Sequence, residues 1–108
     1  MNIYHKLAEI VENGPPAVFC LLTRATGSTP RKAGSAMIVF QDGSFIGTVG
    51  GGKFESLCIE GALALLKNGN TNVLSYQLVD PSKGDPGVCG GEMEVYLEVV
   101  GRKYTVLV

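Results

Sequence analysis

The centre of the chain carries the stretch Gly47-Thr48-Val49-Gly50-Gly51-Gly52-Lys53-Phe54-Glu55. Three successive glycines weaken the interior of a strand or helix, and they suit a place where the backbone turns tightly or approaches another group closely. The apolar residues before them predict the end of a strand, and those after them predict the start of a helix. Because the first N–H groups of a helix have no partner within it, this loop is a candidate anion site.

The patterns on either side of this loop predict an α+β fold. Helical spacing of apolar residues predicts helices over Ile3–Asn13 and over residues 54–66. Apolar runs and alternating patterns predict strands at residues 17–23, 36–40, 45–49, 73–79, 92–100 and 104–108. The pair Asp42-Gly43 predicts a hairpin between the second and third of these strands. We expect a single compact domain over residues 1–108, with two helices and a mixed sheet of about six strands.

Composition excludes several classes of protein. The chain has 108 residues, a formal net charge of -1 and a sequence pI near 5.7, so it lacks the basic surface of a nucleic-acid binder. No apolar run approaches the roughly 20 residues of a membrane span. The N-terminal residues also lack the charged and apolar regions of a secretory signal. We therefore expect a cytoplasmic protein with no nucleic-acid or membrane partner.

The three cysteines differ in their surroundings. Cys20 and Cys58 fall within apolar patterns, where a thiol behaves as a small core side chain. Cys89 lies between a loop over residues 80–87 and two glycines, which is a setting in which a thiol can be reached and its pKa altered by nearby cations. The sequence has no CxxC pair, so it does not indicate a structural zinc site. Its only histidine, His5, lies on the predicted polar face of the first helix. A cysteine or serine hydrolase is therefore not supported.

Residues 24–34 are rich in hydroxyls, glycines and cations, and they predict a loop. Two interpretations remain open. This segment is a solvated loop with a turn at Pro30, or Ser28, Thr29 and Arg31 supply hydrogen-bond donors to an oxyanion or a polar cofactor.

The glycine loop also resembles other phosphate-binding motifs in part. Residues 47–53 satisfy the first seven positions of a P-loop, but Phe54 stands where a Ser or Thr must reach Mg²⁺. The chain is also short for the parallel core of an NTPase, and the three glycines do not give a dinucleotide-binding fingerprint in register. Nucleotide hydrolysis is therefore disfavoured.

Three motifs in order resemble the XdhC/CoxI family, in its N-terminal type of domain. They are Gly-Ser-Thr-Pro-Arg-Lys-Ala-Gly-Ser-Ala-Met at residues 27–37, the glycine loop at 47–55, and Cys89-Gly90-Gly91-Glu92. Members of this family are accessory factors for molybdenum hydroxylases such as xanthine dehydrogenase and carbon monoxide dehydrogenase. The resemblance extends from the first helix to residue 100.

This resemblance implies a chaperone that binds the molybdenum cofactor (molybdopterin) transiently, supports its sulfuration and delivers it to the hydroxylase apoenzyme. It also implies self-association as a homodimer. Cys89 would be the reactive thiol of the site and a candidate metal ligand, since thiolate is a soft ligand. The other implied cofactor-binding residues are Ser28, Thr29, Arg31, Gly50, Gly51, Gly52, Lys53, Glu55, Gly90 and Gly91.

The sequence departs from the family pattern in two ways, and these leave two alternatives. Lys53 stands where many members have a cysteine, and the Rossmann-like second domain of many members is absent from this sequence. One alternative is an enzyme, a sulfur carrier in which Cys89 takes up a persulfide from a cysteine desulfurase. The other is an interaction module without a ligand, which binds the hydroxylase or a separate Rossmann-domain subunit.

Overall fold

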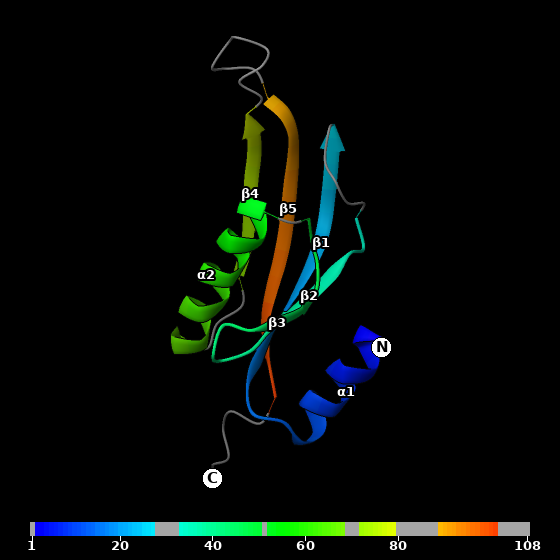
Figure 1. The fold of residues 1–108 in the computed structure, drawn as a ribbon, viewed down its shortest axis with the longest axis vertical. Coiled ribbons are helices and arrows are strands. Elements are labelled where there is room, and N and C mark those ends of the chain that lie inside the picture. Colours follow the sequence, from blue (N-terminus) through cyan, green and yellow to red (C-terminus); the bar gives the residue numbers. More distant parts are fainter. Residues whose placement is uncertain (1, 28–32, 51, 69–71, 80–88, 102–108) are drawn as a thin grey trace.

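A five-stranded antiparallel sheet with its longest strands in the centre forms the frame of the molecule (Figure 1). The computed structural model describes residues 2–27, 33–50, 52–68, 72–79 and 89–101. The sheet has the order β3-β2-β1-β5-β4. The elements are α1 (Ile3–Asn13), β1 (Ala17–Gly27), β2 (Ala36–Val39), β3 (Phe45–Gly47), α2 (Gly52–Asn68), β4 (Asn72–Val79) and β5 (Cys89–Val100).

The predicted α+β class and its two helices are confirmed, and the predicted sheet is corrected. About six strands are not confirmed, because the described residues contain five and the expected strand at 104–108 lies outside them. The expected mixed pairing is wrong, since every described pair of strands is antiparallel. The reason is that β3 and β4, which α2 connects, lie at opposite edges of the sheet instead of side by side.

The central strand β1 is longer than predicted. It continues through Arg24 to Gly27, a segment that the sequence placed in a loop. Its pairing with β5 shifts register between Leu22 and Arg24, so Thr23 is an extra residue in the strand. The Thr23 hydroxyl donates to the main-chain oxygen of Glu94 at 3.1 Å and to its carboxylate at 2.9 Å. This bulge interrupts the alternation of apolar and polar residues, which is why the sequence pattern did not show a strand.

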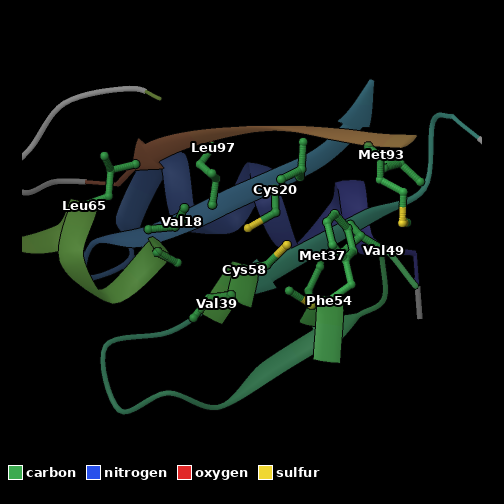
Figure 2. Packing of buried hydrophobic residues seen from close by; sticks show 13 residues of the cluster. Val18, Cys20, Met37, Val39, Val49, Phe54, Cys58, Leu65, Met93 and Leu97 are labelled. Atoms are coloured by element: carbon green, nitrogen blue, oxygen red, sulfur yellow. The ribbon is translucent and has the colours of Figure 1, made fainter. Parts of the chain in front are cut away.

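The two helices pack against opposite faces of the sheet. One core cluster, drawn in Figure 2, joins α2 to β1, β2 and β5 through side chains that include Val18, Cys20, Leu22, Met37 and Cys58. A smaller cluster under α1 contains Ile10, Ala17 and Ile38. Successive side chains of a strand point to opposite faces. Burial on both faces therefore explains the continuous apolar run at the start of β1.

The predicted hairpin is confirmed, and its turn is closed by local hydrogen bonds. Oδ1 of Asp42 accepts from the backbone N–H of Ser44 at 2.9 Å and from the Ser44 hydroxyl at 2.6 Å. The N–H of Phe40 donates to the carbonyl of Ser44, and Gly43 adopts a φ of 88°. The second strand of this hairpin, β3, leads directly into the glycine loop.

Candidate functional site

The glycine loop is held in place by the side chain of Thr48. The Thr48 hydroxyl accepts a hydrogen bond from the N–H of Gly50 at 3.1 Å and donates one to the carboxylate of Glu55 in the first turn of α2. The N–H of Thr48 donates to the carbonyl of Ala36 in β2 at 3.1 Å. One threonine therefore connects the end of the hairpin, the loop and the start of the helix.

Two buried side chains anchor the loop on either side of its glycines. Val49 is fully buried and Phe54 nearly so, and both belong to the core cluster under α2 (Figure 2).

Gly52, the first residue of α2, differs from these two residues in its surroundings. Its φ is 56°, and a Cβ built on it would meet nothing within 4 Å. Lys53 beside it is exposed. The start of α2 thus offers accessible backbone next to a cation, which is an arrangement that suits an anionic group.

Gly47, where the loop begins, is tightly surrounded by β2 and α1. Its φ is 77°, and a Cβ there would lie 2.5 Å from the carbonyl oxygen of Ala36 and 2.7 Å from Cδ1 of Ile3. A side chain does not fit at this distance. Glycine at residue 47 therefore lets the end of β3 lie close to Ala36 of β2 and Ile3 of α1 before the chain enters the loop.

A second group of glycines lies at the end of the sheet where β1 finishes and β5 begins. Gly27 pairs with Gly91, and Val79 at the end of β4 pairs with Cys89. The register shifts between Leu78 and Val79, which makes Gly90 an extra residue in β5. Bulges of this kind are frequent beside active sites, because they change the direction of the neighbouring side chain.

The structure thus places each end of the 27–37 motif beside another motif, because Gly27 pairs with Gly91 and Met37 pairs with Gly47. Ser28, Thr29 and Arg31 follow shortly after Gly27 in the sequence. Those three residues and Gly51 lie outside the described residues. The glycine loop reaches β5 further along the strand, where Val49 shares the core cluster with Met93. Because Gly90 is an extra residue, Cys89 and Met93 are three paired positions apart, which is about 10 Å at roughly 3.3 Å per residue. A single pocket with both Cys89 and the loop stays a prediction.

The predicted core role of the other two cysteines is confirmed. Cys20 and Cys58 are fully buried, and Figure 2 shows their sulfur atoms facing each other between β1 and α2. Burial raises the pKa of the Cys58 thiol to about 12, with a further contribution from the charge of Glu55. Burial also raises the pKa of Cys20, as does the neighbouring Cys58. Both thiols remain protonated and unreactive at neutral pH.

Sequence reasoning assigned no role to Thr48, although it is the residue that organises the loop. Its signal in the sequence is a hydroxyl two residues before a glycine, a spacing that allows the side chain to accept from that N–H. Glu55 was predicted as a cofactor-binding residue, and in the structure its carboxylate accepts from Thr48. This contact orients the first turn of α2 relative to the loop.

Within the described ranges, no group of three or more His, Cys, Asp and Glu side chains is placed to hold a metal ion. The Cys89 side chain is outside that description, so its role as a metal ligand stays a prediction. Neither α1 nor α2 combines the length and the apolar character that a membrane-crossing helix requires.

Fold and loop together define a small α+β domain whose glycine-rich turn opens a helix. The chain belongs to the XdhC and CoxI family, whose model matches residues 10–77, and this match confirms the family resemblance over a range that contains the motifs at 27–37 and 47–55. It is 33% identical over 104 residues to the uncharacterized protein YqeB of Escherichia coli strain K12, covering 95% of this chain and 19% of YqeB. It also resembles the crystal structure of a xanthine dehydrogenase from Bacillus halodurans, with a TM-score of 0.74 and 25% identity. That likeness covers 94% of this chain and 31% of the other, so the chain spans less than a third of either relative.

Proposed function

We propose that this chain is a cofactor-binding accessory domain that serves a molybdenum hydroxylase such as xanthine dehydrogenase. Its membership of the XdhC and CoxI family and its likeness to a structure described as a xanthine dehydrogenase support this role. The ligand of the proposal is the molybdenum cofactor, bound transiently and passed to the hydroxylase apoenzyme. In this role the domain is a chaperone and performs no reaction of its own.

The observation that carries the proposal is the open backbone at the start of α2. Gly52 leaves room for a group to approach the first N–H donors of the helix, and Lys53 adds an exposed positive charge. The cofactor brings a phosphate and a dithiolene-bound molybdenum centre, and the phosphate matches this combination of donors and charge. The residues present therefore fit the anionic part of the cofactor.

Each site residue has a distinct task in this proposal. Gly50, Gly51 and Gly52 bind the phosphate through their backbone, while Lys53 contributes charge. Glu55 acts as a positioning residue, since it holds Thr48 and through it the loop. At the end of the sheet, Cys89 is the soft thiol ligand for the metal centre, and Gly90 and Gly91 allow close approach. Donors to the polar groups of the cofactor come from Ser28, Thr29 and Arg31.

Binding of isolated molybdenum cofactor to the purified protein tests the phosphate assignment. We expect Lys53→Ala to weaken binding about tenfold, which corresponds to about 1.4 kcal/mol. Lys67→Ala is the matched control, because Lys67 is an exposed lysine in the last turn of the same helix. Equal affinities for the two variants would remove the glycine loop from the site.

Cys89 requires a separate experiment, because it belongs to the other glycine-rich region. We expect Cys89→Ser to lose most of the cofactor affinity while the protein unfolds at the same urea concentration as the wild type. Mass spectrometry after incubation with a cysteine desulfurase and cysteine distinguishes the two roles of this thiol. A gain of one sulfur atom at Cys89 would identify a sulfur carrier, and unchanged cofactor binding in the serine variant would exclude the ligand role.

A further inference from the structure

The face of the sheet opposite α2 is covered by a helix over only part of its area. Among the described residues α1 is the one helix on this face, and it contacts β2 more than any other strand. Figure 1 shows β1 and β5 extending well beyond α1. Strands lie about 4.8 Å apart and packed helices about 8–10 Å apart, so one helix covers about two strands. The face therefore has room for a second helix beside α1.

The part of this face beside α1 combines apolar and acidic side chains. The register places Leu21 of β1 opposite Tyr96 of β5, and Phe19 opposite Glu98. Glu94 shares the face with them, because side chains alternate along a strand. All five side chains are half-buried, and we call these five residues the open face. A strand face that meets only water needs neither a leucine nor two aromatic rings.

The side of α1 that borders the open face is apolar and exposed. Tyr4 is 52% exposed and Val11 is 53% exposed. They are seven residues apart, which places them on the same side of the helix. The ring of Tyr4 lies against that of Phe19, with centroids 6.1 Å apart. This side of α1 therefore continues the apolar part of the open face, and apolar surface of this kind, bordered by polar residues, is typical of a binding site.

The charge of the open face is negative. The carboxylates of Glu94 and Glu98 each accept a hydrogen bond from a neutral hydroxyl, at 2.9 Å and 3.2 Å, which leaves both charges in place. Further along β5, Glu92 forms an ion pair with Arg24 at 3.6 Å, so the charges of that pair balance each other. Lysine or arginine side chains of a partner complement the two remaining carboxylates.

We propose that the open face binds a basic amphipathic helix of a partner protein, which packs beside α1 across β1 and β5. The apolar side of this helix contacts Leu21, Tyr96 and the ring of Tyr4. Its lysine or arginine side chains pair with Glu94 and Glu98. A helix is favoured over an extended segment, since β1 and β5 together have about the width of one packed helix. An anionic membrane surface is disfavoured, because its charge has the same sign as that of the glutamates.

A synthetic peptide serves as the probe for this surface. It has about 18 residues, with leucines at helical spacing and lysines elsewhere, so that it is long enough to form a helix. A second peptide has glutamates in place of the lysines. Fluorescence anisotropy of the labelled peptides measures their dissociation constants for the purified protein. We expect binding of the lysine peptide and none of the glutamate peptide, and binding of neither or of both equally would overturn the proposal.

Two matched pairs of variants locate the binding. Glu98→Lys should weaken it about tenfold or more, because attraction becomes repulsion. Glu60→Lys makes the same change at an exposed residue of α2, on the other side of the sheet, and should have little effect. Tyr4→Ala should also weaken binding about tenfold, because aromatic side chains often dominate interfaces. Its control is Phe45→Ala, which removes an exposed ring from β3. Equal effects within both pairs would show non-specific attraction and overturn the proposal.

Two further measurements keep the proposal testable. If Glu98→Lys does not fold, Glu98→Gln removes the charge alone and should weaken binding about two- to fivefold. Sedimentation velocity of the protein without peptide tests a second copy as the occupant, and a dimer that Tyr4→Ala dissociates would overturn the proposal. Lys53→Ala, in the glycine loop, should bind the lysine peptide like the wild type. The open face lies opposite α2, so this proposal and the cofactor site fail separately.

Discussion

The hairpin turn and the glycine loop contain the same local hydrogen bond, from a backbone N–H to the side chain two residues before it, but this bond has a different structural role in each. In the turn, Asp42 accepts from the N–H of Ser44, and in the loop Thr48 accepts from the N–H of Gly50, in both cases two residues ahead. The turn is then closed by two backbone hydrogen bonds, from the N–H of Phe40 to the carbonyl of Ser44 and from the N–H of Gly43 to the carbonyl of Phe40. In the loop, the Thr48 hydroxyl also donates a hydrogen bond to the carboxylate of Glu55 in α2. A turn that satisfies its own donors reverses the chain, whereas a loop bonded to a helix fixes the first turn of that helix relative to the sheet.

Replacing one glycine in each segment tests this comparison most strongly. Gly47→Ala should lower the free energy of unfolding by about 3 kcal/mol or more, because it combines a positive φ with a close contact to the backbone of β2. Gly43→Ala has a similar φ, but its Cβ would be 4.0 Å from the nearest atom, Cδ1 of Leu63. We expect about 1 kcal/mol there. Urea unfolding measures both losses, and equal losses would show that the close packing around Gly47 does not oppose a side chain.

Removing the hydroxyl of Thr48 tests the connection between loop and helix. Thr48→Val keeps the shape of the side chain but leaves the N–H of Gly50 and the carboxylate of Glu55 without this partner. We expect a loss of about 1–2 kcal/mol in the free energy of unfolding and a weaker affinity for the molybdenum cofactor. Thr48→Ser, which keeps the hydroxyl, is the control. Equal cofactor affinities for Thr48→Val and Thr48→Ser would show that cofactor binding does not require the hydrogen bonds of the Thr48 hydroxyl.

Gly52→Ala separates the stability of the loop from its proposed use. The new methyl group meets no neighbouring atom, so only the positive φ opposes it, at about 1 kcal/mol. The same methyl group projects into the space proposed for the phosphate. We therefore expect a larger loss of cofactor binding than of stability, as measured by titration and urea unfolding. A variant that binds as well as the wild type would place the phosphate elsewhere.

The smallest expected effect concerns the pH dependence of the hairpin turn. Hydrogen bonds from the side chain and the backbone of Ser44 lower the pKa of Asp42 below its usual value of 3.8. A carboxylate with a lowered pKa in the folded state stabilises the fold above its unfolded pKa, and this contribution is lost as the pH falls through the folded pKa. Acidification from about pH 5 to about pH 3 should therefore destabilise the wild type slightly more than Asp42→Asn. Equal slopes of stability against pH would show that the turn does not depend on the charge.

Local patterns predicted those parts of the molecule in which neighbours in sequence are neighbours in space. The helix Ile3–Asn13 was predicted with its observed bounds, because apolar spacing and the Gly14-Pro15-Pro16 stop are local signals. Local patterns also predicted the hairpin around Asp42-Gly43 and the burial of Cys20 and Cys58. For the candidate site, sequence reasoning found the glycine loop and Glu55 but missed the role of Thr48, since that role depends on how α2 is oriented.

By itself the sequence determined the family, the α+β class and the position of the glycine loop, because motifs and periodicity are carried by consecutive residues. Only the tertiary structure decided that β1 continues to Gly27, that Gly27 lies opposite Gly91, and that β4 is left at an edge of the sheet. The physical reason is that strand pairing joins residues far apart in the chain. A bulge such as the one at Thr23 shifts the alternation that a strand displays, and only the partner strand reveals where a strand ends.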